Sequence, residues 1–553
     1  MFFRNRFHTP LAITFAFVAT HNHFVLDRGG KVFNRSAPII KLPAGATEES
    51  HFGLLGLLNA STACFWLKQI SHNKGATVDD KGARQRTDPF EDFYEFTGSG
   101  LQKFPLAAPP PVDLARSLDT QAGALADNLP ATVCAHSVPT RHALDKARRA
   151  AETAKGAMIS LQEELDWRCY RLYGLIDDAL EHAAPPPLSL GERAFEIVMA
   201  RRVAAGELET TWFGRHGSNP VTELPNYWSA NYRAVVERRI ELMASSPTIA
   251  LIEQAEYKRR WSTAPWETQE REALRHWLLD RLEDLRFWSA AEPRLVSTRA
   301  LADAARKDPD FPSVASLYAG GAAFDLDALV AELVAKDSVP FVATLRYSET
   351  GLRKRADWET TWDKQRQEDA IDTAVTREQL QRRQERWRQE NPRQDGESAA
   401  AWQARLQTAL ASPEVTTALQ SVIDRIADQR KQAEIGTISS PPKYKQADFL
   451  SADFWRLRGG LDVPKERFVS FPHCARDADG SLPVLWAGYD HLARAKAIAA
   501  WYVERKESDG WPSPLDPVAR RIAGTGPLDV PVAQRCRSSH GPAHGRPLCR
   551  FHQ

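Results

Sequence analysis

From about residue 141 onward, apolar residues recur at intervals of three and four, and this period predicts a chain built mainly of helices. The clearest stripe would occupy one face of a long helix, and its members are Met158, Leu161, Leu165, Cys169, Leu172 and Ile176. A second stripe within residues 267–288 consists of Leu274, Leu278, Leu282 and Leu285. A strongly charged helix is expected from about Trp358 to Glu390, where Asn391-Pro392 ends it.

The first part of the chain has a different pattern, which predicts strands as well as helices. The run LAITFAFVAT, residues 11–20, is rich in β-branched and aromatic residues and predicts a buried strand. The turn residues 27–30 (DRGG) favour a hairpin that continues through Val32-Phe33 and Ile39-Ile40. Residues 51–70 return to helical spacing, with five core candidates: Leu54, Leu57, Leu58, Phe65 and Leu67. The fold class expected is therefore mainly α and multi-domain, with a small α+β part at the N-terminus.

Changes in composition along the chain divide it into six segments. Proline clusters and the start of the charged helix set most of these boundaries. The expected segments are an α+β part (1–140), a helical spacer (141–183), a mainly helical domain (184–345), a long charged helical segment (346–438), a C-terminal α+β segment (439–516) and a disordered tail (517–553).

Bulk composition excludes some classes of protein and leaves nucleic-acid binding open. The 553 residues carry 72 Lys and Arg against 71 Asp and Glu, so a nucleic acid would have to be bound by a local basic patch. Six scattered cysteines are too few for a disulfide framework and fit a reducing cytoplasm. No apolar run approaches the roughly 20 residues of a membrane span, so we expect a cytoplasmic protein without a membrane partner.

Several long stretches resemble one family of large bacterial enzymes. Residues 11–43 and 54–75 look like the target-recognition region of adenine-specific DNA methyltransferases. More narrowly, the C-terminal half of the PglX family, adenine-specific DNA methyltransferases of BREX-type phage defence, is similar to six stretches: QEELDWRCYRLYGL (162–175), ERAFEIVMARR (192–202), TWFGRHGSNPVTELP (211–225), YKRRWSTAPWETQE (257–270), GLRKRADWETTW (351–362) and FWRLRGGLDVPKERFVSFP (454–472). The resemblance covers about residues 9–512, and it implies a chain that lacks the family's catalytic half.

A complete enzyme of that family would bind S-adenosylmethionine in a class I methyltransferase domain. It needs a glycine-rich turn that opens a helix, and an (Asn/Asp/Ser)-Pro-Pro-aromatic loop that binds the flipped adenine. Gly98-Ser99-Gly100 opens no obvious helix, and in Ser440-Pro441-Pro442-Lys443 a lysine stands where the aromatic residue belongs. We therefore expect no catalytic and no cofactor-binding residues in this chain, and no complete Rossmann-like domain.

Three other residue groups receive a structural interpretation. His21-Asn22-His23 spells a nuclease name, but such a site needs widely spaced ligands, so a polar strand end is expected. No metal site is expected elsewhere either, because the spacing of five C-terminal residues fits no common zinc template: Cys536, His540, His544, Cys549 and His552. Glu163, Glu164 and Asp166 are interpreted as a solvated helix face and not as an acid–base pair.

The remaining candidate residues are those that could contact double-stranded DNA. Phosphates favour Arg and Lys beside glycine turns, and base edges favour Arg, Asn and Gln. The DNA-binding candidates are Arg28, Gly29, Gly30, Lys31, Asn34, Arg35, Lys68, Lys74, Lys258, Arg259, Arg260, Arg353, Lys354 and Arg355.

Two functions follow from the resemblance. One is the DNA-recognition and assembly portion of a phage-defence adenine methyltransferase, which contacts DNA and other defence proteins but does not methylate alone. The other is a methyltransferase subunit that a separately encoded S-adenosylmethionine-binding chain completes. Whether the chain is itself an enzyme is left open by the sequence.

Overall fold

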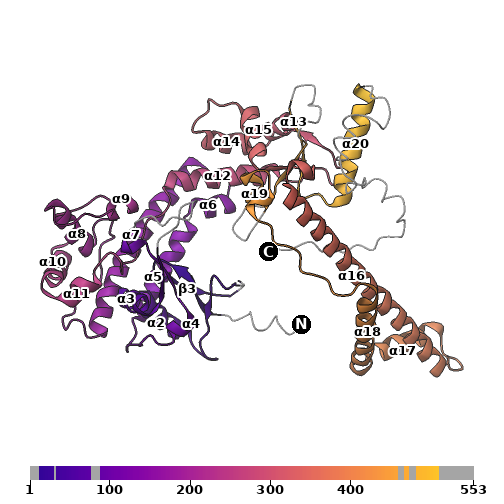
Figure 1. Cartoon of the computed structure of the whole chain (residues 1–553), viewed down its shortest axis with the longest axis horizontal. Coiled ribbons are helices and arrows are strands. Elements are labelled where there is room, and N and C mark those ends of the chain that lie inside the picture. The colour runs from indigo at the N-terminus through magenta and orange to yellow at the C-terminus, as the bar shows by residue number, and fades with distance from the viewer. Residues whose placement is uncertain are drawn as a thin grey trace. The chain divides into compact units, whose positions relative to one another are not determined.

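The computed structural model describes residues 11–75 apart from 30 and 32, and residues 88–458, 466–471 and 481–509. Within these ranges it contains nineteen α-helices and ten short strands, which confirms the predicted helix-rich fold (Figure 1). The chain divides into two compact units, residues 1–278 with 313–323 and residues 279–312 with 324–553. Gly30, Val32 and the five candidate zinc ligands of the C-terminal tail lie outside the described residues.

Two small antiparallel sheets begin the first unit. One has the order β3-β1-β4, from Phe24–Asp27, Ala12–Phe15 and Ile39–Ile40. The other has the order β2-β6-β5, from Val18–Ala19, Phe93–Glu95 and His72–Gly75. The expected hairpin is thus corrected: the first strand pairs with Phe24–Asp27, which precedes the glycine turn, and Ile39–Ile40 pairs with the other edge of the first strand.

Helices α2 (Glu48–Asn59) and α3 (Ser61–Ile70) cover the first sheet and complete a common core. The Thr47 side chain caps α2 by accepting a hydrogen bond from the Ser50 amide. Among the five predicted core residues of this region, Leu57, Leu58 and Leu67 are fully buried, while Leu54 and Phe65 pack at the edge of a core.

A long helix, α7 (Arg141–Leu172), links this core to a second helical core. Helix α5 (Val112–Asp127) packs along it, and α6 (Pro130–His136) also contacts it (Figure 1). The apolar stripe predicted for this helix is confirmed at Leu165 and Cys169, which are buried in the N-terminal core with Leu161 at its edge. It is wrong for Met158, which packs against the second core, and for Ile176, which lies beyond the end of the helix. On another face, Trp167 and Tyr170 pack with residues of four helices: α8 (Ala194–Ala204), α9 (Trp212–His216), α10 (Ala230–Ser245) and α11 (Pro247–Ile252).

The second predicted stripe falls on α12 (Trp266–Leu282). Leu274, Leu278 and Leu282 are buried, as predicted, but Leu285 is 60% exposed because the helix ends before it. Of the helices not yet named, α4 (Gly98–Leu101) belongs to the first unit, α13 (Thr298–Arg306) and α15 (Leu326–Lys336) belong to the second, and α14 (Phe311–Ala319) falls mostly in the first.

The second unit contains a four-stranded sheet with the order β7-β10-β9-β8. Its strands are Val296–Ser297, Pro483–Trp486, Phe468–Ser470 and Ser338–Pro340. Only the β8–β9 pair is parallel among the described strands. Helices α19 (Ala452–Arg458) and α20 (His491–Asp509) belong to the same unit.

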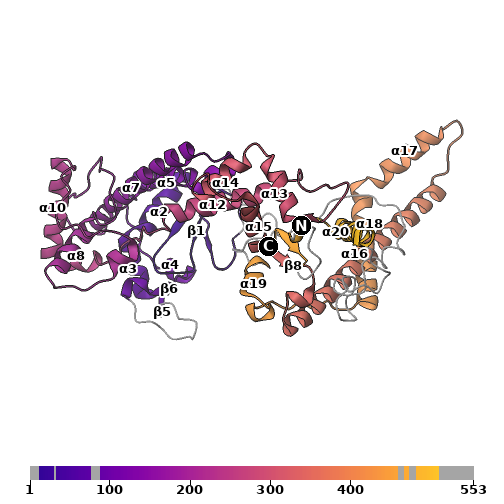
Figure 2. The same cartoon turned by 90° about the horizontal axis from the view of Figure 1, so that it is seen from above.

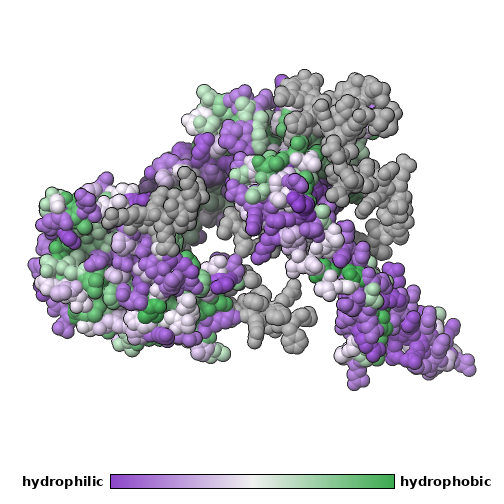
Figure 3. All heavy atoms as spheres, viewed as in Figure 1, coloured by the Kyte–Doolittle hydropathy of each residue, from purple (hydrophilic) through white to green (hydrophobic). Residues whose placement is uncertain are grey.

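The charged helix is α16 (Glu349–Glu390), which begins earlier than the predicted start at about Trp358 and ends at Glu390 as predicted, with Asn391 as its C-cap. It packs against α18 (Pro413–Glu434), with α17 (Ala399–Leu410) between them in the chain, and both views show α16 and α18 side by side (Figure 2). Their shared core is small, and charged and polar side chains cover the face seen in Figure 3. We call α16, α17 and α18 the helical arm.

None of the described sheets resembles the parallel sheet of a class I methyltransferase domain, in agreement with the sequence. None of the described helices is long and apolar enough to cross a membrane.

Candidate nucleic-acid interface

The acidic group on α7 is buried, so its interpretation as a solvated helix face was wrong. The exposed fraction is 1% for Glu163, 1% for Glu164 and 0% for Asp166. Burying carboxylates is costly unless cations and hydrogen-bond donors compensate them. The compensating cations come from segments far away in the sequence.

Lys258 supplies the first of these cations. Its ammonium lies 2.9 Å from Asp166 Oδ2, 2.9 Å from Glu253 Oε1 and 3.3 Å from Glu163 Oε1. The Asp166 carboxylate also accepts hydrogen bonds from the backbone amide and hydroxyl of Ser61, at 2.8 and 2.7 Å. Lys258 is 0% exposed, so its ammonium is an internal cation and not the phosphate contact expected from the sequence.

Burial and neighbouring charges raise the pKa values of both Glu163 and Lys258, for different reasons. It raises the pKa of Glu163 to about 7, only partly offset by Lys258. Although burial opposes its charge, the three neighbouring carboxylates raise the pKa of Lys258. Lys258 therefore stays charged at neutral pH while Glu163 is divided between its two protonation states.

Two buried arginines extend the same network. Arg239 donates to Glu164 Oε2 at 2.6 Å and to the Leu180 carbonyl, which attaches α10 to α7. Arg193 forms a fully buried ion pair with Glu196 at 2.8 Å, and Trp212 donates to the same carboxylate at 3.0 Å. These charges are structural, because each is matched inside the protein.

The His21-Asn22-His23 segment follows β2 and leads into β3. Asn22 donates to the carbonyls of Leu58 and Ala60, at 2.7 and 3.2 Å, and so fixes the segment to the end of α2. His21 is 1% exposed, and among the described residues neither of its ring nitrogens has a partner in good hydrogen-bond geometry, although the Lys258 backbone is close enough to act on the ring. The ring centroids of His21 and His23 are 6.2 Å apart.

Arg259 and Arg260 lie against this segment, although about 240 residues separate them in the chain. Arg260 donates to the Thr20 hydroxyl at 2.5 Å. Arg259 donates to the Asn59 side-chain oxygen at 3.2 Å, and Asn59 also binds the backbone of Phe24. Neither guanidinium forms an ion pair with any described carboxylate, in contrast to Lys258 beside them.

We call His21, His23, Arg259 and Arg260 the histidine–arginine cluster. Burial, followed by the nearby Arg259 and Arg260, lowers the pKa of His23 to about 4. Burial and the charges of Lys68, His23 and Arg260 hold the pKa of His21 well below its usual range. Burial also lowers the pKa of Arg259 to about 10, which leaves it charged at neutral pH. At neutral pH the cluster thus carries the positive charge of its two arginines, while its two imidazoles are neutral.

Three other predicted DNA contacts of the first unit are cations that already bind groups of the protein. Arg28 pairs with Asp119 and Glu48, and Lys74 pairs with Glu95. The ammonium of Lys68, a buried residue, donates to the Glu256 carbonyl at 2.7 Å. Each of these three cations is thus already bound by a protein oxygen.

The loop after β3 presents the most accessible candidates. Gly29 has a φ of 91°, and its amide donates to the Asp27 carboxylate at 3.2 Å. Lys31, Asn34 and Arg35 are exposed, and the Arg35 guanidinium lies 5.6 Å from the centroid of the Phe17 ring. The structure leaves their expected DNA contact as a prediction.

The basic triplet at the start of α16 takes part in local ion pairs. Lys354 lies 2.6 Å from Asp448, Arg355 lies 2.9 Å from Glu359, and the exposed Arg353 lies 3.5 Å from Glu349. A continuous phosphate track at this point would therefore have to compete with three carboxylates.

The two motifs that resemble methyltransferase loops both have structural roles here. The Pro442 carbonyl accepts a hydrogen bond from the Trp358 indole at 2.9 Å, and the Lys443 carbonyl accepts one from Lys354 at 3.0 Å. Gly98 does open a short helix, contrary to the expectation, with the Thr97 hydroxyl as its cap. That helix has only four residues, so its dipole is too small to make an anion-binding N-terminus.

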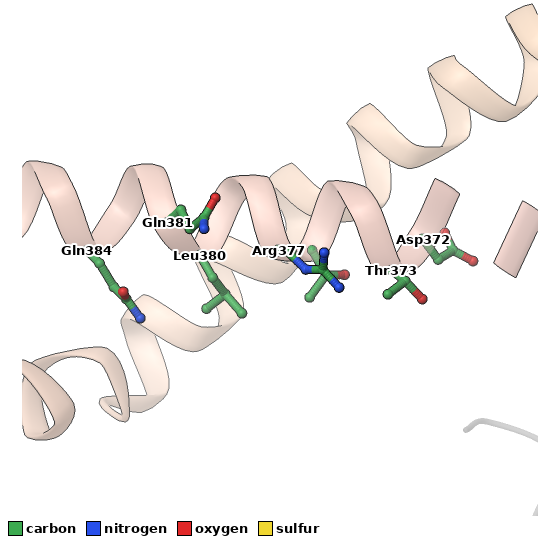
Figure 4. A pocket seen from close by; sticks show the side chains of 7 residues that line it. Asp372, Thr373, Arg377, Leu380, Gln381 and Gln384 are labelled. Atoms are coloured by element: carbon green, nitrogen blue, oxygen red, sulfur yellow. The ribbon is translucent and has the colours of Figure 1, made fainter. Parts of the chain in front are cut away.

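A hollow on the helical arm is a weaker candidate site than the histidine–arginine cluster. Figure 4 shows that its labelled side chains come from one helix, α16: Asp372, Thr373, Arg377, Leu380, Gln381 and Gln384. The described residues also contain no group of three or more metal-ligating side chains. We therefore place the candidate interface at the histidine–arginine cluster.

Sequence reasoning singled out both halves of this cluster but did not bring them together. The sequence predicts a strand end at His21 and His23, and it gives Arg259 and Arg260 as separate DNA-binding candidates. The sequence around the two arginines, Tyr257-Lys258-Arg259-Arg260-Trp261, marks them as a basic and aromatic segment, but it does not indicate that they meet residues 21–23.

Comparisons with known proteins connect this geometry to a family. A family described as "Domain of unknown function (DUF7008)" matches residues 158–528. A curated relative, the "Adenine-specific methyltransferase PglX" of Streptomyces coelicolor, is 43% identical over 502 residues, which are 89% of this chain and 36% of the relative. The chain thus spans about a third of the length of that relative, and no solved structure matches it. The resemblance to PglX found in the sequence is confirmed, and the chain belongs to the DUF7008 family.

Proposed function

We propose that this chain is the DNA target-recognition and assembly portion of a phage-defence (BREX-type) adenine-N6 DNA methyltransferase. The observation that carries the proposal is the pair of guanidinium groups, Arg259 and Arg260, that no described carboxylate neutralises. Guanidinium groups bind phosphate oxygens with good geometry, and phosphate contacts provide most of the affinity of proteins for DNA. The 43% identity to a relative named as an adenine-specific methyltransferase supports DNA as the source of these phosphates.

The exposed loop after β3 would add to this interface. Lys31, Asn34 and Arg35 combine phosphate-binding and base-reading side chains on one exposed segment. Arg35 lies over Phe17 and Arg260 binds Thr20, so the loop and the cluster each contact a residue next to the two-residue strand β2. A duplex that contacts one of them could therefore contact the other.

We further propose that the chain does not bind S-adenosylmethionine and does not methylate by itself. The described sheets are too small for a class I methyltransferase domain, and the two glycine and proline motifs hold structural contacts instead. Other defence proteins, or a separate catalytic chain, would then be its protein partners in a cytoplasmic complex.

Calorimetry with the full chain tests this proposal. Titration with S-adenosylmethionine should release no binding heat, while a labelled DNA duplex should bind with an affinity that falls steeply as salt is added. Binding of S-adenosylmethionine would contradict the recognition role and favour a chain that takes part in methyl transfer. Absence of duplex binding at low salt would contradict the DNA interface itself.

A further inference from the structure

The histidine–arginine cluster has an unusual composition for a protein interior. Four basic side chains lie together, and no described residue meets either ring nitrogen of the buried His21 in good hydrogen-bond geometry, although the Lys258 backbone is close enough to act on the ring. Buried polar atoms are normally hydrogen-bonded, and like charges placed together destabilise a fold. An arrangement of this kind is stabilised when an anion binds.

The surrounding carboxylates do not supply that anion. The carboxylates that act on Arg259 and Arg260 are Asp166 and Glu91. Asp166 is already bound to Lys258 at 2.9 Å, and Glu91 is paired with Arg215 at 3.3 Å. Both negative charges are therefore committed to other cations.

We propose that the histidine–arginine cluster is a binding site for one phosphate-type oxyanion. His23, Arg259 and Arg260 are half-buried and thus accessible from solvent, so they would contact the oxyanion directly. His21 lies deeper and would act as a positioning residue behind them. The proposal extends beyond DNA recognition, because a DNA backbone and a free phosphate ester would offer the same oxygens.

Such a site has a characteristic proton linkage. Without an anion both imidazoles are neutral at pH 7, because burial and the nearby cations lower their pKa values. A bound dianion would raise those pKa values, so binding takes up protons, and affinity increases as pH falls. An ordinary surface patch of arginines shows no such pH dependence, since arginine does not titrate in this range.

Other charged groups around the two imidazoles must be considered as well. Lys68, on α3, acts on His21, and its own carboxylate neighbours are Glu256 and Asp92. His216, on α9, lies near Arg260, Arg193 and Glu196, and burial lowers its pKa. None of these carboxylates forms an ion pair with the histidine–arginine cluster, so the imidazoles remain the groups whose proton uptake reports anion binding.

The experiment measures oxyanion binding to the full chain with sulfate, whose charge does not change between about pH 5 and pH 8. Competition against a fluorescein-labelled duplex gives the affinity, and calorimetry in two buffers of different ionisation enthalpy counts the protons taken up. Between about pH 7.5 and pH 5.5, sulfate should bind about tenfold more tightly, with roughly one proton taken up. Sulfate binding that is independent of pH would overturn the proposal.

Matched variants separate the cluster from the rest of the surface. H23Q should abolish most of the pH dependence, whereas H72Q, an exposed histidine of the same unit, should preserve it. R260Q should weaken sulfate binding about tenfold or more, while R149Q, an exposed arginine on α7, should leave it unchanged. Equal effects of R260Q and R149Q would contradict a built site.

The two arms of the experiment also distinguish this site from the proposed function. Proton-linked sulfate binding without duplex binding would retain the oxyanion site and reject DNA as its source. In the opposite outcome, sulfate would not displace the duplex, and duplex binding would be independent of pH both in H23Q and in the unaltered chain. That outcome would retain DNA recognition and reject the oxyanion site.

Discussion

The ammonium of Lys258 lies 2.9 Å from Oδ2 of Asp166, and neither side chain is exposed. This contact joins the loop before α12 to the C-terminal part of α7. Arg259 and Arg260, the next two residues, face the opposite situation, because no described carboxylate pairs with them. The internal pair thus anchors the segment that presents the two unpaired guanidiniums.

Removing the internal cation should destabilise the first unit strongly. In K258M, Asp166 and Glu253 would lose the ammonium that they share inside the protein. Loss of one partner from a buried ion pair costs about 3–5 kcal/mol. Urea unfolding monitored by tryptophan fluorescence measures this cost, with the exposed K146M on α7 as the control. A difference below about 1 kcal/mol between the two variants would show that the network is not needed for stability.

Glu163 should make the first unit less stable as pH rises. Its pKa is raised to about 7 in the folded protein, above the ordinary value of 4.5. A raised carboxyl pKa contributes stability that is present below the ordinary pKa and is lost as pH increases through the folded value, here between about 4.5 and 7.

E163Q keeps the side chain neutral and should remove this dependence, which amounts to roughly 3 kcal/mol at most. Unfolding free energies measured at about pH 5 and pH 8 for both proteins test the difference. Parallel pH profiles for the variant and the unaltered chain would contradict the assignment.

His23 should destabilise the fold in acid. Its pKa is lowered to about 4 from an ordinary value of 6.5, so its contribution is present above 6.5 and is lost as pH falls toward 4. Between pH 6.5 and 4 the free energy of unfolding should fall further in the unaltered chain than in H23Q, by up to about 3 kcal/mol. Melting temperatures across the interval measure this, and H72Q should behave as the unaltered chain does.

The helical arm depends on a small core, so one truncation should open it locally. Ile423 is 6% exposed and packs with Ile371 and Val375. I423A should cost about 2 kcal/mol, near the lower end for a buried isoleucine because the core is small. Hydrogen exchange should accelerate in α16 and α18 while α7 keeps its protection. L380A, at a residue 37% exposed, should change neither region.

The local sequence pattern predicted where helices and strands lie better than it predicted which elements pack or pair with one another. The stripe from Leu165 to Cys169 and the end of α16 at Asn391 follow from helical period and from proline, both of which act within a few residues. The predicted hairpin was wrong because Phe24–Asp27, of which only Asp27 had been assigned, as part of the turn, is itself the strand that pairs with β1.

The electrostatics of the site could not be predicted in the same way. Glu163 and Asp166 look like surface residues in the sequence because their counter-ion, Lys258, is 92 positions from Asp166. The cluster joins His21 to Arg260 through contacts of even longer range, including the Arg260–Thr20 hydrogen bond. Charge pairing of this range depends on packing between elements, which composition and period do not encode.

The central claim is that Arg259 and Arg260 bind phosphate groups of DNA, and the salt dependence of duplex binding tests it most directly. Fluorescence anisotropy of a labelled duplex with the full chain gives the slope of log affinity against log salt. Each phosphate contact removed should reduce the magnitude of that negative slope by about 0.9. The slope of R259Q/R260Q should therefore be shallower than that of R149Q by roughly 2. An identical slope for R259Q/R260Q and R149Q would contradict the claim.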